Sequence, residues 1–206
     1  GLGLSQVDLA ILLETMGETL LCAPFFSTVA LAANGILEIA DDAQKSEFLP
    51  PLADGSQTAT LAFTESNGGW DAADIETTAT PSGDEFILEG RKYGVVDGHS
   101  AERLLIVARA PNSVGEDGIS TFMVSRDQSG VSSKALPTMD QTRRLSEVGL
   151  SGVRVSKQSV LGDVGNAWPG VRRTLDLAAI ALAAEQVGGA SRCLEMSVAY
   201  AKEREQ

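Results

Sequence analysis

Several chemically reactive residue types are scarce in this sequence. Its 206 residues include one histidine, His99, and two cysteines, Cys22 and Cys193. A Ser-His-Asp triad, a Cys-His pair or a tetrahedral zinc site needs histidine or several cysteines close together, so most of these chemistries are excluded. We therefore predict no metal site, a largely solvated turn position for His99, and reduced core thiols for the two cysteines.

Positive charge is also in short supply. Sixteen Lys and Arg residues stand against 28 Asp and Glu residues, which gives a formal net charge of -12. A surface this acidic repels phosphate backbones and anionic lipid headgroups. We expect no nucleic-acid partner, and the lack of a signal-peptide pattern indicates a cytoplasmic protein.

One long hydrophobic run occurs, between Thr19 and Leu37, where no residue is charged. The run has about the length of a membrane span, but it contains Pro24, and its flanks are acidic rather than basic. Two short buried helices that separate at Pro24 explain these features better. We therefore predict no membrane span.

The sequence does contain enough apolar residues, 43%, for a substantial core, and their spacing divides the chain into three regions. Residues 1–57 have the pattern of the end of a helical domain. Ser5 and Asp8 have the spacing of a capping box, Pro24 suits a first helical turn, and a third helix is expected to begin at Asp41-Asp42 and end at Pro50-Pro51.

Residues 58–163 change to the pattern of β-strands. Short apolar runs alternate with turn signals such as Asp97-Gly98. Strands of this length and spacing are typical of an antiparallel sandwich or barrel. The expected strands include the runs that start at Ile75, Phe86, Tyr93, Leu104, Ile119 and Val153.

Residues 164–206 return to helical spacing. From Pro169 to Gln206 no second proline occurs, and apolar residues recur along the whole stretch. A helix of about 37 residues is far longer than an average globular helix and is typical of a bundle. Either further helices follow in a longer chain or a partner chain supplies them, so we expect the sequence to be a piece of a longer protein.

Four segments carry motifs in a consistent order. They are Gly1-Leu-Gly-Leu-Ser with Asp8, then Thr60-Leu-Ala-Phe-Thr-Glu65 followed by Asn67-Gly-Gly-Trp-Asp71, then Gly90-Arg-Lys-Tyr-Gly-Val-Val-Asp-Gly98, and finally Arg204-Glu205-Gln206. Together with the order of helices, β-region and long helix, these motifs resemble the acyl-CoA dehydrogenase family. The resemblance covers the whole chain and implies an α+β fold: N-terminal helices, a middle antiparallel β-barrel or sandwich, and the start of a C-terminal four-helix bundle.

The resemblance also implies a function. In the family, FAD accepts a hydride from the β-carbon of an acyl-CoA, a glutamate removes the α-proton, and the electrons pass to an electron-transfer flavoprotein. Members run nearly twice this length and assemble as tetramers. The resemblance therefore implies FAD as cofactor, an acyl-CoA as substrate and an electron-transfer flavoprotein as partner.

The family's flavin contacts match this sequence unevenly. Thr64, with Phe63 before it, falls where the family hydrogen-bonds the flavin ring. Trp70 replaces the serine that contacts the pyrophosphate. Gly94 replaces the aromatic residue that covers the flavin, and Val96 replaces the threonine that bonds N5. Glycine offers no stacking surface and valine no hydrogen-bond donor.

The catalytic glutamate has two known locations in the family. Most members carry it in the C-terminal part that lies outside this sequence. Others carry it on the first long bundle helix, two residues after the aspartate that matches Asp176, and that position is Ala178 here. We therefore assign no catalytic residue in this sequence, and Glu185 is interpreted as a bundle-surface or inter-helix residue.

Arg204 and Gln206 match the segment that reaches the FAD of a neighbouring subunit in the family. The resemblance implies that both bind cofactor in trans, although composition alone favours a solvated helix end. This combination resembles the non-catalytic subunit of heteromeric enzymes used on steroid side chains in actinobacteria. Alternatives are a self-sufficient homotetramer with its base in the missing part, or a monooxygenase or nitroalkane oxidase of the same fold.

Overall fold

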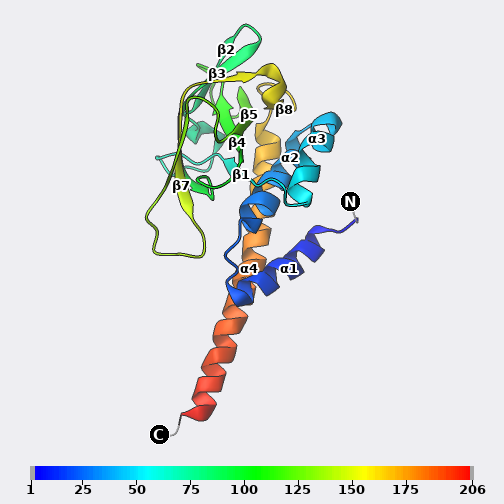
Figure 1. Ribbon diagram of the computed structural model, residues 1–206, viewed down its shortest axis with the longest axis vertical. Helices are drawn as coiled ribbons and strands as arrows, with labels where there is room; N and C mark the ends of the chain where they lie inside the picture. Colours follow the sequence, from blue (N-terminus) through cyan, green and yellow to red (C-terminus); the bar gives the residue numbers. More distant parts are fainter. Residues whose placement is uncertain (1–2, 205–206) are drawn as a thin grey trace. The chain divides into compact units, whose positions relative to one another are not determined.

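The computed structural model describes residues 3–204 (Figure 1). The chain forms two compact units. One comprises the residues up to Ala23 together with those from Asp176 onward, and the other comprises Pro24–Leu175. The first unit is helical, whereas the second combines helices with a β-sheet.

Three consecutive helices open the larger unit. They are η1 (Phe26–Ala33), a π-helix, followed directly by α2 (Asn34–Ile39) and then by α3 (Asp42–Ala53). Pro24 precedes the first of them, as predicted. Asp41 begins α3 by accepting the N–H of Gln44 at 2.8 Å.

The predicted end of α3 at Pro50-Pro51 is wrong, because the helix continues for two more residues, to Ala53. A proline removes its own N–H from a helix, but its carbonyl group still accepts a hydrogen bond. The N–H of Asp54 donates to Pro50 at 3.0 Å, and the N–H of Gln57 donates to Pro51 at 2.9 Å. These two bonds complete a final turn after the prolines.

The sheet of this unit contains eight strands, and its hydrogen-bonded order is β6-β7-β3-β2-β4-β5-β8, with β1 beside β4. The predicted strands at Phe86 and Tyr93 are parts of one long strand, β3, and the strand expected from Ile75 begins at Thr78. The strands are β1 (Ala59–Ala62), β2 (Thr78–Ser82), β3 (Glu85–Val96), β4 (Arg103–Arg109), β5 (Ile119–Ser125), β6 (Val131–Ala135), β7 (Leu145–Ser156) and β8 (Val160–Leu161).

The expectation of a purely antiparallel barrel or sandwich is corrected in two respects. β1 pairs with β4 in parallel, Ala59 beside Arg103, and β2 also meets β4 in parallel. Among the described residues the strand path ends at β6 and β8 rather than closing on itself. Strand spacing alone did not predict strand direction, because a long connection allows either direction whereas a short hairpin allows one.

The two faces of the sheet are buried in different ways. One face packs its own side chains into a cluster that includes Phe86, Ile106 and Phe122. The other face meets the helices, since a Cβ on Gly35 of α2 would lie 3.0 Å from the Leu105 side chain. β4 is therefore buried on both faces, which explains its continuous rather than alternating apolar sequence.

The helical unit contains α1 (Gln6–Thr19) and most of α4 (Trp168–Glu203). The predicted capping box is confirmed, because the backbone N–H of Ser5 donates to the Asp8 carboxylate at 2.7 Å. The two helices cross at glycines. A Cβ on Gly17 would collide with the backbone carbonyl of Glu185, and a Cβ on Gly188 would collide with that of Glu14. The backbones approach closely because these positions lack side chains.

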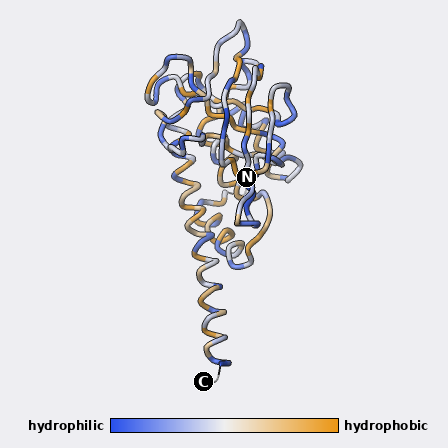
Figure 2. The backbone as a smooth tube through the Cα atoms, turned by 90° about the vertical axis from the view of Figure 1, so that its left-hand side faces the viewer, coloured by the Kyte–Doolittle hydropathy of each residue, from blue (hydrophilic) through white to orange (hydrophobic). Residues whose placement is uncertain are grey.

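α4 confirms the predicted long helix, with 36 residues. Figure 2 shows hydrophobic residues along its whole length, including the C-terminal part. No helix in the described part of the chain is both long and apolar enough to cross a membrane. Cys22 and Cys193 are exposed, so their prediction as core thiols is wrong. The large apolar side chains exposed on α4 are Ile180, Val187, Leu194, Met196, Val198 and Tyr200.

Candidate functional site

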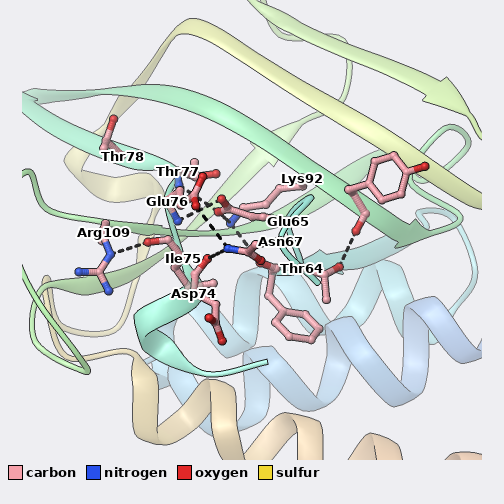
Figure 3. Close-up of polar contacts among 12 residues, drawn as sticks. Thr64, Glu65, Asn67, Asp74, Ile75, Glu76, Thr77, Thr78, Lys92 and Arg109 are labelled. Carbon is pink, nitrogen blue, oxygen red and sulfur yellow. Dashed lines mark hydrogen bonds and ion pairs between the residues drawn. The ribbon is translucent and has the colours of Figure 1, made fainter. Parts of the chain in front are cut away.

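The segment that contains Thr64 and Glu65 lies beside the segment that contains Lys92, Tyr93 and Gly94. Residues 63–65 follow β1 and lie against residues 92–94 of β3. The N–H of Tyr93 donates to the carbonyl of Thr64 at 2.9 Å. The hydroxyl of Thr64 in turn donates to the carbonyl of Tyr93 at 2.6 Å (Figure 3). The single proton of the Thr64 hydroxyl is thus already used within the protein.

A buried ion pair joins the same two motifs. Lys92 Nζ lies 2.6 Å from Glu65 Oε1, and the two side chains are 0% and 5% exposed. Lys92 also donates to the carbonyl of Phe63 at 3.2 Å. The Glu65 carboxylate further accepts the backbone N–H groups of Glu76 at 3.0 Å and of Thr77 at 2.9 Å. Every charge in this pair is therefore compensated locally.

Burial and pairing move the pKa values of both groups. Burial lowers the pKa of Lys92 from 10.5 to about 8, because removal from water disfavours the ammonium form, although the Glu65 charge opposes this shift. Burial raises the pKa of Glu65, but the Lys92 charge and the hydrogen bonds from Lys92 and Thr77 outweigh it, so that the pKa is lowered. Both groups are charged at neutral pH.

The loop of residues 66–77, called here the 66–77 loop, is held from two further sides. The side-chain amide of Asn67 donates to the carbonyl of Asp74 at 2.7 Å, and the N–H of Gly69 donates to Asn67 at 3.1 Å. The guanidinium of Arg109 on β4 donates to the carbonyls of Ile75 at 2.6 Å and Ala72 at 2.7 Å. Figure 3 shows the contacts of Asn67 with Asp74 and of Arg109 with Ile75.

Trp70 extends from this loop with 64% of its surface exposed. Its indole contacts the buried ring of Phe63 edge to face, with ring centroids 5.2 Å apart and an interplanar angle of 76°. Phe63, which was predicted as a cofactor-binding residue, is 7% exposed. Its ring therefore supports Trp70 rather than offering an open surface of its own.

Gly94 lies at an irregularity of β3, where the register with β7 shifts between Lys92 and Val95. Its φ of +74° is one that side-chain-bearing residues rarely adopt. Among the described residues, a Cβ at this position would meet Thr64 Oγ1 alone, at 3.9 Å. Val96 is half-buried, and its carbonyl accepts the Thr60 hydroxyl at 2.7 Å.

These residues do not fit FAD in the manner that the resemblance implies. Gly94 and Val96 present neither a ring nor a side-chain donor, and the hydroxyl proton of Thr64 is donated to Tyr93. Trp70 brings one N–H donor on a bulky indole to the position of a small hydroxyl. The side chains at these positions therefore do not supply the flavin contacts that the resemblance implies.

The place of the catalytic base is apolar as well. Ala178, on α4, is 6% exposed and carries a methyl group. Glu185 lies two turns further along α4, where α1 crosses it, which is consistent with an inter-helix residue. The assignment of no catalytic residue stays a prediction.

Arg204 stands at the end of α4 and is exposed. Its guanidinium carbon lies 5.9 Å from the centroid of the Tyr200 ring, and its N–H donates to the Tyr200 carbonyl at 3.0 Å. Gln206, the other residue predicted to act in trans, lies outside the described residues. The role of both in cofactor binding stays a prediction.

His99 is half-buried rather than largely solvated. Its backbone N–H donates to the Ser146 hydroxyl at 2.9 Å, and ring Nδ1 lies 3.1 Å from the same oxygen. These bonds attach the turn after β3 to β7. Among residues 3–204 no three His, Cys, Asp or Glu side chains are grouped as metal ligands.

The sequence alone predicted no role for Lys92, Glu65 or Arg109. One signal was available for Lys92, which shares strand parity with the apolar residues Phe86 and Leu88 and is buried as they are. Parity does not identify its partner. Glu65 and Arg109 both bind the backbone of residues 72–77, and the parallel pairing of β1 with β4, which the sequence did not predict, brings their strands side by side.

Two family models match this chain. The model "Acyl-CoA dehydrogenase, N-terminal domain" matches residues 1–56, and the model "Acyl-CoA dehydrogenase, middle domain" matches residues 60–153.

The chain is also similar to individual known proteins. The chain is 33% identical to a 3-(aryl)acrylate reductase of Clostridium sporogenes, over 86% of this chain and 48% of that protein. It is 31% identical to the CarC subunit of the caffeyl-CoA reductase-Etf complex of Acetobacterium woodii, over 86% and 47%. A solved glutaryl-CoA dehydrogenase of Mycobacterium smegmatis in complex with FADH2 has a TM-score of 0.78 and 26% identity, over 86% and 45%.

The chain thus spans about half the length of the curated relatives that it matches. Both matched models describe successive parts of one architecture, and their order agrees with the helices and the sheet described above. The chain belongs to the acyl-CoA dehydrogenase family.

Proposed function

We propose that this chain is the non-catalytic, cofactor-completing subunit of a heteromeric acyl-CoA dehydrogenase. The assembled enzyme would introduce an α,β double bond into an acyl-CoA, with FAD held chiefly by a second, dehydrogenase-like subunit. One observation carries the proposal: three of the four flavin-contact positions, Trp70, Gly94 and Val96, lack the required chemistry, and the fourth, Thr64, donates its proton to Tyr93.

The proton transfer that this reaction requires also falls to the partner. A general base needs a titratable group within hydrogen-bond reach of the α-carbon. At one of the two family positions this chain has the methyl group of Ala178, which is buried. FAD supplies hydride acceptance when it is bound. The contribution of this chain is then to help bind and orient the cofactor rather than to transfer protons.

Arg204 provides the cofactor-completing part of the proposal. A guanidinium presents several N–H donors in a planar fork that suits a diphosphate. Arg204 is exposed, and its guanidinium carbon lies 5.9 Å from the centroid of the Tyr200 ring. Such a side chain is available to the FAD of a neighbouring subunit, and we propose that Gln206 binds the same cofactor.

Substrate and electron acceptor are proposed from the chemistry of the relatives. The relatives include the CarC subunit of a caffeyl-CoA reductase-Etf complex and a glutaryl-CoA dehydrogenase in complex with FADH2. We propose an acyl-CoA substrate, from lipid or steroid side-chain catabolism, and an electron-transfer flavoprotein as acceptor. The assembly would be a heterotetramer in the cytoplasm.

A self-sufficient homotetramer is the second candidate. It is favoured by the match to about half of each relative, since the remaining half would have room for a catalytic glutamate and for further flavin contacts. Thr64 is retained in both cases. The two candidates differ in whether this polypeptide alone holds stoichiometric flavin.

The test is the flavin content of the purified full-length protein. Expressed alone, it should be colourless and inactive with acyl-CoA substrates and an artificial electron acceptor. Co-expressed with a dehydrogenase-like chain from the adjacent reading frame, it should co-purify as a yellow complex. A homo-oligomer with close to one FAD per chain would overturn the partner-subunit proposal and support the homotetramer.

A further inference from the structure

We propose that Glu65, Lys92 and Arg109 are positioning residues that lock the 66–77 loop in one conformation, with Trp70 turned outward, before any cofactor or subunit arrives. The inference rests on the proposed function, which it deepens. A fixed loop keeps the indole of Trp70 at the position where a flavin pyrophosphate would need a small hydroxyl.

The lock acts on both ends and on the middle of the loop. Glu65 accepts the N–H groups of Glu76 and Thr77 at its C-terminal end, and the backbone carbonyl of Glu65 accepts the N–H of Gly68 at 3.0 Å at its N-terminal end. Arg109 binds the carbonyls of Ala72 and Ile75 in between. Donors and acceptors of the loop backbone are thus held by the side chains of Glu65, which follows β1, and of Arg109 on β4.

The loop is also closely packed. A Cβ on Gly69 would collide with the side chain of Asp74. The Asp74 carboxylate in turn accepts the N–H of Asp71 at 3.0 Å. Trp70 therefore stands between two residues whose backbones are fixed, and its ring has Phe63 behind it. Movement of the indole away from its place requires breaking several of these contacts together.

The charge of the pair is necessary to this arrangement. Lys92 neutralises Glu65 in a position without water contact, and the remaining carboxylate capacity of Glu65 goes to the loop amides. Replacement of a buried ion pair by apolar residues of similar size is often neutral or stabilising for a fold. Such a replacement removes the acceptor for the loop amides while leaving the surrounding sheet packed, so it separates positioning from stability.

The experiment compares wild type with the double variant Glu65→Met/Lys92→Met by hydrogen exchange under native conditions. We expect exchange of the amides of residues 66–77 to rise at least about 10-fold, because the N–H groups of Glu76 and Thr77 lose a charge-assisted acceptor. Exchange in β4 and β5 should change less than about twofold. Unchanged exchange in the loop, or equal acceleration in the loop and in β4 and β5, would overturn the proposal.

A matched control lies on the same strand. Arg91 pairs with Glu147 at 2.6 Å, and this pair is 65% and 28% exposed. Arg91→Gln/Glu147→Gln removes an adjacent β3–β7 ion pair without touching the loop, so exchange of residues 66–77 should stay at the wild-type rate. If it rises as in the first double variant, the loop depends on β3 in general and the proposal fails.

A second variant covers the case in which the Met pair does not fold. Arg109→Lys keeps the positive charge but loses the fork that reaches the carbonyls of Ala72 and Ile75 in the loop, together with those of Ser113 and Gly115. It should loosen residues 70–77 and leave β7 unchanged, and unchanged exchange of the loop would contradict the proposal. Flavin content is measured on the same samples. Stoichiometric flavin in the wild-type protein would refute the proposed function, whereas the exchange data test the lock by themselves.

Discussion

The two places at which this chain could meet a flavin are built in opposite ways. At the motif around Thr64, the polar groups already bond to other groups of this chain. The Thr64 hydroxyl donates to Tyr93, and the Glu65 carboxylate binds Lys92 and the loop amides. At the end of α4, Arg204 is exposed and its charged group lies beside one aromatic ring.

This difference determines which existing interactions a ligand would have to displace at each place. A cofactor that requires the Thr64 hydroxyl proton would have to displace its 2.6 Å bond to Tyr93, whereas one at Arg204 would displace solvent. The donors at Thr64 and Lys92 therefore serve the fold, whereas the Arg204 side chain is exposed. The predictions below test each side of this contrast.

The largest effect is expected from removing one partner of the buried Lys92–Glu65 pair. Lys92→Ala leaves the Glu65 carboxylate buried without its cation, which should lower the free energy of unfolding by about 3–5 kcal/mol. Urea denaturation measures this change. The exposed neighbour Arg91→Ala serves as control and should cost less than about 1 kcal/mol. A loss below about 1 kcal/mol for Lys92→Ala would mean that the Thr64 motif is not sealed by this pair.

The next effect concerns Arg204, the exposed residue at the end of α4. If Arg204 reaches the FAD of a partner, Arg204→Ala should weaken flavin retention roughly 10- to 150-fold, which corresponds to about 1.5–3 kcal/mol for a charge-assisted hydrogen bond. Arg204→Lys should recover part of this loss, because it restores the charge without the fork.

The measurement for Arg204 is the flavin-to-protein ratio of the co-purified complex after gel filtration. Oligomer size should stay the same, since an exposed side chain at a helix end adds little to assembly. An unchanged ratio together with unchanged turnover would identify Arg204 as a solvated helix-end residue, and the contrast between the two places would lose its functional meaning.

A third prediction uses two adjacent glycines of α4. Gly188→Ala places a methyl group against the backbone carbonyl of Glu14 and should destabilise the protein by about 1–3 kcal/mol. At Gly189 the nearest atom to a new Cβ is the carbonyl oxygen of Gly17 at 3.7 Å, an ordinary contact. Gly189→Ala should therefore stabilise by about 0.5–1 kcal/mol through helix propensity. Thermal melts of both variants test this, and equal effects would contradict the close crossing of α1 and α4.

The smallest effect is a dependence on pH. Lys92 releases its proton near pH 8 in the folded protein but near pH 10.5 when unfolded, so the unfolded chain binds more protons between these values. This group makes the free energy of unfolding rise with pH across that window, by at most about 1.4 kcal/mol per pH unit, and the contribution is lost as pH falls through 8. Urea titrations of wild type and Lys92→Met at pH 7.5, 8.5 and 9.5 give the difference. A difference that shrinks as pH rises would contradict the direction of the shift.

Local sequence signals predicted much of the fold. The Ser5–Asp8 capping box, the helix after Pro24 and the length of α4 depend on residues close together in sequence, and the structure contains all three. Strand direction was missed, because the parallel pairing of Ala59 with Arg103 depends on a distant partner. The exposure of Cys193 was missed as well, since helical spacing does not reveal which face of α4 is covered.

The candidate site was predicted less completely than the fold. Motif positions identified Thr64, Trp70 and Gly94, but the donor role of the Thr64 hydroxyl is a matter of geometry that no motif records. The Lys92–Glu65 pair was likewise hidden, because both residues are charged and charged residues usually face solvent. Their burial follows from hydrogen bonds to backbone groups across the chain.

The parallel placement of β1 beside β4 has a consequence for the order of folding. The β2–β3 and β4–β5 neighbours are close in sequence, whereas Ala59 must wait for Arg103, which follows two further strands. Because loop closure over longer separations is slower, we expect β1 and the Phe63–Glu65 segment behind it to join the sheet after these two hairpins have formed. Early on the folding path Lys92 is therefore still hydrated, and its dehydration accompanies the step that completes the motif.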